Sequence, residues 1–246
     1  MAKGDLLMDN NGLIIISAYE KLKQEMNEQE INKIDQVWRS FLEKINKWPT
    51  QKTQIVDGYF SIDMEKIAGT GPGGKTTRKN FEQFLTDLPD QVVSRNEYKS
   101  VDSIYTKDLH KFNKDIEEHS IEGIISLTIM FSHQSPDLIF KKMPYIDVLF
   151  TVLWNKMRNY PNYVQSDRPN SLTKRFFNSI FQESFTTIID ENKLNDVALK
   201  LGIETNNSYV IKQMLVRRTI SDYLHKHYPA EKSKFIHAAL AWWIVK

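Results

Sequence analysis

Residues 59–105 read YFSIDMEKIAGTGPGGKTTRKNFEQFLTDLPDQVVSRNEYKSVDSIY, and the order of residue types predicts a series of short elements. Residues 58–62 are rich in aromatic and β-branched side chains, which favour a strand. Asp63 can cap a short helix over residues 64–68. Residues 69–74 contain four glycines and a proline, so they must form a turn.

A longer helix is predicted directly after this turn, over residues 76–88. Its apolar side chains recur at helical spacing and form one buried stripe, Phe81, Phe84, Leu85 and Leu88. Pro89 stops the helix because proline disfavours helical backbone in the residue before it. Residues 91–94 and 98–105 then predict the two strands of a small β-hairpin.

This succession of strand, short helix, turn, longer helix and hairpin resembles a winged helix-turn-helix, a nucleic-acid-binding domain. The resemblance implies that the longer helix is the recognition helix and that its start contacts DNA. Six consecutive residues at that start include no carboxylate: Lys75, Thr76, Thr77, Arg78, Lys79 and Asn80. Arg and Asn can bond to base edges, whereas Lys and Thr suit phosphates. Arg95 and Lys99 would contact phosphate from the wing.

Two other patterns overlap the same stretch. Residues 69–76 have the spacing of the phosphate-binding loop of NTPases, but the charged residues 63–68 before them have a helical pattern instead of the buried strand that such a loop follows. Asp90, Glu97 and Lys99 follow the order seen in metal-dependent nucleases. No mixed α/β core is apparent around them, so a solvated wing is the preferred interpretation.

Composition bounds the class of protein. The chain has 246 residues, of which 41% are hydrophobic, so it can bury a sizeable core. Its net charge is only +2, and any basic surface must therefore be local. The absence of Cys excludes disulfides, Cys-ligated zinc and thiol catalysis. No apolar run is long enough for a membrane span and no signal peptide is apparent, so we expect a cytoplasmic protein without membrane attachment.

Outward from the opening stretch, we predict three parts: an N-terminal arm (1–27), a winged helix-like domain (28–107) and a helical domain (108–246). Residues 12–23 suggest a strand entering a helix, or an arm that inserts into a neighbouring subunit. Asn27 can cap a helix that runs to about Trp48 and begins the winged domain.

The helical domain is predicted from caps, prolines and apolar spacing. We expect helices over residues 121–131, 136–142, 144–160, 171–189, 208–227 and 233–245, the last of them amphipathic. Residues 193–203 and the helix from Ser208 again suggest a helix-turn-helix, and Arg217 and Arg218 would form a second nucleic-acid contact surface.

Arg218 and His225 also suggest a catalytic alternative. They lie seven residues apart on one helix, and this pairing resembles the Arg and His of HEPN-type RNases. That family usually places a polar residue, often Asn, after the Arg, where this chain has Thr219. The other interpretation is a solvated basic face. The six histidines show no metal-ligand spacing supported by carboxylates.

The sequence therefore predicts a mostly α protein with a non-enzymatic role in nucleic-acid binding, DNA being favoured over RNA. A replication initiator or regulator of a plasmid or phage would have these features, and the abundant Lys, Asn and Ile are typical of AT-rich genomes. The main alternative is a nucleoprotein that coats single-stranded RNA as a homo-oligomer. We expect no cofactor and no metal.

Overall fold

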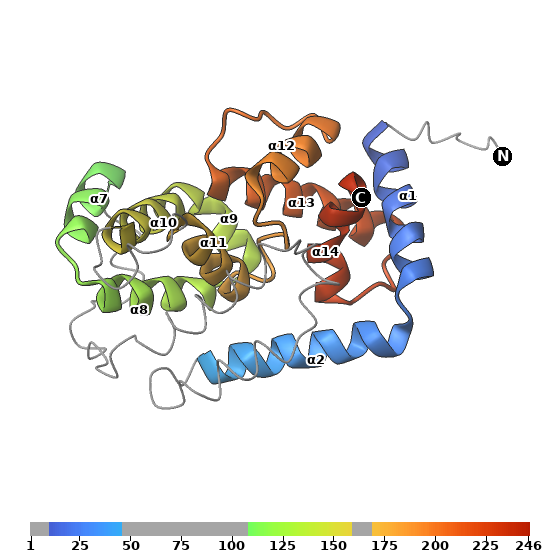
Figure 1. Cartoon of the computed structure of the whole chain (residues 1–246), viewed down its shortest axis with the longest axis horizontal. Coiled ribbons are helices and arrows are strands. Elements are labelled where there is room, and N and C mark those ends of the chain that lie inside the picture. Colours follow the sequence, from blue (N-terminus) through green and yellow to red (C-terminus); the bar gives the residue numbers. More distant parts are fainter. Residues whose placement is uncertain (1–9, 46–107, 159–168) are drawn as a thin grey trace.

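The computed structural model describes residues 10–45, 108–158 and 169–246. These residues are mostly helical, as the sequence predicts, and within them no strand occurs (Figure 1). The helices are α1 (Asn10–Glu25), α2 (Glu28–Ile45), α7 (Leu109–Glu117), α8 (Ile121–Ser132), α9 (Pro136–Lys141), α10 (Met143–Arg158), α11 (Pro169–Ile180), α12 (Glu191–Lys200), α13 (Tyr209–His227) and α14 (Lys234–Val245).

The predicted winged helix-turn-helix has no support among the described residues. Its strands at 58–62, 91–94 and 98–105 and its recognition helix at 76–88 all lie outside them. The wing and the β-hairpin therefore stay predictions. None of the described helices is long and apolar enough to cross a lipid bilayer.

Several helices begin directly after a capping side chain that can be recognised in the sequence. Ser120, Ser208 and Ser233 each precede a helix, and each hydroxyl accepts a hydrogen bond from the backbone N–H three residues on, at 3.1, 3.3 and 3.0 Å. Asn27 and Glu30 form a reciprocal capping box at the start of α2: Asn27 Oδ1 accepts from the Glu30 N–H at 2.9 Å, and Glu30 Oε2 accepts from the Asn27 N–H at 3.2 Å. These caps confirm the predicted starts of the four helices.

The helix predicted over residues 171–189 is wrong at both ends, since α11 starts at Pro169 and stops at Ile180. Backbone groups that would bond to one another in a longer helix instead form hydrogen bonds with side-chain amides. The Asn178 amide donates to the carbonyl of Thr186 at 2.9 Å and to that of Ile188 at 3.1 Å, and the Thr186 N–H donates to Gln213 Oε1 at 3.0 Å. The apolar side chains that suggested one helix are buried all the same, Phe181 and Phe185 with their rings stacked at 5.4 Å.

Residues 12–23 lie within α1, so the strand predicted at their start is wrong. Helix α1 packs along α14 at the opposite end of the chain, and Ile15, Ala18 and Leu22 are buried there (Figure 1). The prediction of a strand failed because the apolar run that begins at Leu13 favours either structure, and the buried positions recur every three to four residues.

Helices α13 and α14 form the centre of the fold. Helix α13 contacts α10, α12, α14 and α1, whereas α14 contacts α1, α2, α12 and α13. Nine of the twelve residues of α14 are buried, so the amphipathic face predicted for it is absent. Small residues such as Ala238, Ala239 and Ala241 allow neighbouring helices to cover it from several sides. Trp38 of α2 adds an edge-to-face contact with Phe235, with ring centroids 5.9 Å apart.

The packing of α1 on α14 is testable with two leucines of the same helix. Leu22 is fully buried and Leu13 is 56% exposed. Leu22→Ala leaves a cavity and should lower the free energy of unfolding by about 2–5 kcal/mol. Leu13→Ala is the control and should change it by less than about 0.5 kcal/mol. Chemical denaturation measures both, and equal small effects would contradict the packing of α1 on the core.

Candidate functional site

Eight of the ten residues predicted to contact nucleic acid lie outside the described residues: Lys75, Thr76, Thr77, Arg78, Lys79, Asn80, Arg95 and Lys99. The NTPase-like loop and the nuclease-like group of Asp90, Glu97 and Lys99 lie outside them too. The remaining two, Arg217 and Arg218, are adjacent on α13 but sit in different surroundings.

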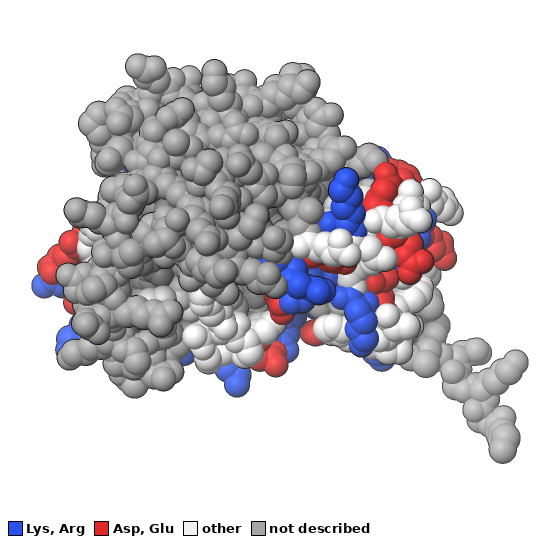
Figure 2. All heavy atoms as spheres, turned by 90° about the horizontal axis from the view of Figure 1, so that it is seen from below, with Lys and Arg blue, Asp and Glu red and all other residues white. Residues whose placement is uncertain are grey.

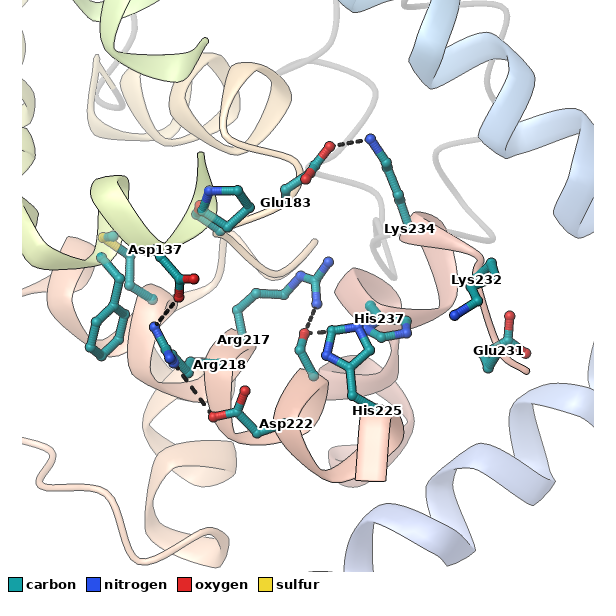
Figure 3. Close-up of a pocket in the computed structure, with 15 residues that line it drawn as sticks. Asp137, Glu183, Arg217, Arg218, Asp222, His225, Glu231, Lys232, Lys234 and His237 are labelled. Carbon is teal, nitrogen blue, oxygen red and sulfur yellow. Dashed lines mark hydrogen bonds and ion pairs between the residues drawn. The ribbon is translucent and has the colours of Figure 1, made fainter. Parts of the chain in front are cut away.

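A cavity of about 510 Å³ lies where α9, α13 and α14 meet. Arg217, Arg218, Ser221 and His225 reach it from α13, and His237 from α14 (Figure 3). Asp137 of α9 and Asp222 of α13 line it as well, and the segments before α12 and around the start of α14 add Glu183, Glu231, Lys232 and Lys234. The cavity therefore collects cations, carboxylates and imidazoles from parts of the chain far apart in sequence.

Arg217 is only 4% exposed, and its guanidinium points into this cavity (Figure 3). Its Nη1 donates to the Ser221 hydroxyl, while its Nε has no hydrogen-bond partner. Among the described residues no carboxylate forms an ion pair with it. Burial lowers the pKa of Arg217 to about 9, although the charge of Glu183 opposes this shift. The group thus remains a cation at neutral pH.

Arg218, in contrast, has carboxylate partners on two sides. Its Nη1 lies 3.0 Å from Asp137 Oδ1, its Nε lies 3.4 Å from Asp222 Oδ2, and its guanidinium stands 4.5 Å from the centre of the Phe140 ring. The side chain is 40% exposed. Its charge is therefore largely compensated within the protein.

Ser221 and His237 extend the polar contact that Arg217 begins. The Ser221 hydroxyl lies 3.2 Å from His237 Nδ1, and the His225 ring centroid lies 5.0 Å from that of His237. Burial, with the charges of Arg217 and His225, lowers the pKa of His237 to about 3. A neutral imidazole of such low basicity is a poor general base, so the Ser221–His237 contact does not favour nucleophilic catalysis.

Arg218 and His225, the predicted RNase pair, both line this cavity. The structure shows no hydrogen bond or ring contact between the two side chains. Arg218 faces Asp137 and Asp222, whereas His225 lies beside His237 (Figure 3). In the described parts of the chain, no cluster of three or more His, Asp or Glu side chains could hold a metal ion.

The start of α13 is buried in the fold. Lys212 is 3% exposed, and its ammonium donates to Asn195 Oδ1 at 2.7 Å and lies 3.6 Å from Glu191 Oε1. Tyr209 and Gln213 are buried beside it. A recognition helix has to expose its first turns to a groove, so the α12–α13 pair has the connectivity of a helix-turn-helix without its exposed contact surface.

A second cavity of about 660 Å³ adjoins the first and shares Glu231, Lys232 and Lys234 with it. Two carboxylates that line it, Asp35 and Glu231, hold neighbouring helices together. Asp35 accepts a hydrogen bond from the Phe235 N–H at 2.8 Å, and Glu231 accepts one from the Tyr19 hydroxyl at 2.9 Å. This cavity is therefore bounded by structural contacts between α1, α2 and the start of α14.

Five residues that line the cavity were not predicted from the sequence as site residues: Glu183, Ser221, Lys232, Lys234 and His237. One signal was available: His237 is the only titratable residue between Phe235 and Val245, in an otherwise apolar helix. The four-residue spacing of Arg217 and Ser221 places them on one face of α13, but their shared cavity depends on the position of α14.

The described residues on the face seen from below show no field of a single sign (Figure 2). Figure 2 shows Lys and Arg side chains next to Asp and Glu side chains on the face seen from below. Comparison with protein-family models, curated proteins and solved structures gave no match. Function must therefore be argued from this chain alone.

The pKa of His237 predicts an acid-sensitive contribution to stability. Below pH 6.5, the usual pKa of histidine, His237 binds a proton in the unfolded chain. In the folded chain the pKa of His237 is about 3, so the proton binds only near that pH. From pH 7 to pH 5 this should lower the free energy of unfolding by about 2 kcal/mol. Urea denaturation of wild type and His237→Asn across this range measures the effect.

The variant should lose that part of the pH dependence. His110→Asn is the control, because His110 is exposed on α7 and its replacement should leave the profile unchanged. Identical pH profiles for wild type and His237→Asn would contradict the burial of a neutral His237.

Proposed function

We propose that the chain binds nucleic acid, with DNA preferred over RNA, as a replication initiator or regulator of a plasmid or phage would. The observation that carries this proposal is the run of residues 75–80, which follows a glycine-rich turn and has three cations and no carboxylate. In a recognition helix these residues would face base edges and phosphates, and the exposed amides of the helix start would add to the attraction for anions.

The helical body supports this proposal by anchoring both ends of the segment that contains the basic run. Helix α2 packs through Ile31, Ile34 and Trp38, and it contacts α14. Helix α7 buries Phe112 and Ile116 and contacts α10. Residues 46–107 thus leave and re-enter the described fold at helices that pack on its core. The winged domain predicted over residues 28–107 would begin with α2 and be joined to the packed helices through α2 and α7.

The interpretation as an RNA-coating protein has less support. It relied in part on an N-terminal arm that exchanges between subunits, whereas α1 packs on α14 of its own chain. The HEPN-like interpretation also loses support, because Arg218 is paired with two carboxylates. Both stay testable as outcomes of the binding experiment below.

The recognition-helix proposal predicts how salt affects binding of a labelled DNA duplex. Each phosphate contact contributes about −0.9 to the slope of log affinity against log salt concentration. Arg78→Ala with Lys79→Ala should weaken binding and flatten this slope by about two phosphates. Fluorescence anisotropy across a salt series measures both quantities.

Lys111→Ala with Lys114→Ala is the matched control, since it removes two exposed cations from α7 and leaves the basic run intact. Binding that both double variants reduce equally would show only a general charge effect. Unchanged affinity and slope in the Arg78/Lys79 variant would contradict the recognition helix. Preference for single-stranded RNA with growing oligomers would favour the coating protein, and cut strands on a denaturing gel would favour a nuclease.

A further inference from the structure

We propose that the cavity between α9, α13 and α14 binds a phosphate group, with Arg217 as its principal contact. This site is separate from the basic run at residues 75–80 and goes beyond the nucleic-acid binding proposed above. A cavity of about 510 Å³ is of the size that accommodates small-molecule ligands. The ligand we infer is therefore inorganic phosphate or a compact phosphate monoester.

The state of Arg217 is the first argument. A buried cation without a counter-ion is unfavourable, and proteins compensate such charges with carboxylates or with bound ligands. Arg217 is 4% exposed, and among the described residues its Nε has no partner and its one hydrogen bond goes to the neutral Ser221 hydroxyl. A guanidinium offers several N–H donors in a planar fork that matches two oxygens of a phosphate.

The second argument is that the nearby carboxylates are already paired with other groups. Asp137 and Asp222 are ion-paired with Arg218, and Glu183 is ion-paired with Lys234. Glu231 accepts from the Tyr19 hydroxyl and lies 3.5 Å from the Lys23 ammonium. In the described parts of the chain, no carboxylate that lines the cavity is left over for Arg217, so a bound anion would complete the charge balance.

The third argument is that other hydrogen-bond donors line the same cavity. Lys232 and Lys234 line the same cavity, and Lys232 has no ion pair with any described residue. Two backbone N–H groups at the start of α14 are already used, since Phe235 donates to Asp35 and Ile236 donates to the Ser233 hydroxyl. The anion would therefore be held by side chains. A tetrahedral anion with four oxygens can accept from an arginine, a hydroxyl and a lysine together, which suits phosphate better than a carboxylate.

The competing explanation is that Glu183 neutralises Arg217. Glu183 lies close enough for its charge to favour protonated Arg217, although it is the Lys234 ammonium that pairs with it in the structure. The two explanations differ in what Glu183→Gln should do. If phosphate is the partner, removing this carboxylate strengthens phosphate binding. If Glu183 is the partner, the variant is destabilised and binds no phosphate.

Isothermal titration of the full chain with inorganic phosphate, at constant ionic strength maintained with chloride, tests the proposal. We expect saturable binding to one site, at least tenfold weaker in Lys234→Gln and absent in Arg217→Leu. Glu183→Gln should bind at least threefold more tightly. Lys226→Gln is the control, because Lys226 is exposed on α13 and does not line the cavity. Circular dichroism establishes whether each variant is folded.

The Lys234 and Glu183 variants retain the buried arginine, so they keep the test decisive if Arg217→Leu fails to fold. Absence of saturable binding to wild type would overturn the proposal, as would equal affinities in wild type, Lys234→Gln and Glu183→Gln. Adenosine monophosphate and ribose serve as further probes: binding of the former without the latter would support recognition through phosphate, and equal binding of both would overturn it. The Arg78/Lys79 double variant should bind phosphate like wild type, so failure of either proposal leaves the other standing.

Discussion

Helix α13 carries two buried cationic side chains, Lys212 and Arg217. Each buried charge needs a compensating partner close by. Near the start of the helix, Glu191 is this partner for two buried lysines: its oxygens lie 3.0 Å from the Lys174 ammonium and 3.6 Å from that of Lys212. Burial alone would raise the pKa of Glu191, but the two lysines together lower it. The carboxylate is therefore charged in the folded chain, and the stability it contributes is lost as the pH falls through its pKa.

Arg217 lies five residues further along the same helix, and its charge is not compensated in the same way. Lys212 has Glu191, Asn195 and the carbonyl of Thr205 as partners, whereas Arg217 has only a serine hydroxyl among the residues that the structure describes. Arg175 on α11 is likewise buried with Nε and Nη2 unbonded, but neither of the two cavities described is lined by it. Arg217 is thus a buried arginine with access to a cavity, and this combination makes it a candidate for ligand binding.

Local chemistry made much of the helical architecture predictable. The hydroxyls of Ser120, Ser208 and Ser233 cap their helices because a side-chain oxygen can satisfy an N–H that has no partner within the helix. The end of α11 at Ile180 could not be predicted in this way. It depends on Asn178 and on Gln213, which lies 33 residues beyond that end, and such contacts exist only after the chain has folded.

The candidate site was predictable only in part. Arg217 and Arg218 were both predicted to form a second nucleic-acid contact surface, yet successive residues on a helix point about 100° apart. Which of them faces the core depends on where α9, α10 and α14 pack around α13. The convergence of Glu183, Lys234 and His237 on one cavity depends on the same packing. Residues 75–80, in contrast, are a functional hypothesis that needs only the order of residue types.

The central claim is that Arg217 is a buried cation whose counter-ion comes from outside the protein. NMR of the arginine Hε–Nε groups tests it most directly, with the Arg217 signal assigned by its loss in Arg217→Leu. Without phosphate we predict a signal without the downfield shift of a strong hydrogen bond, and with phosphate a progressive downfield shift that saturates. A signal already shifted downfield without phosphate, and displaced only by Glu183→Gln, would contradict the claim and identify Glu183 as the internal partner.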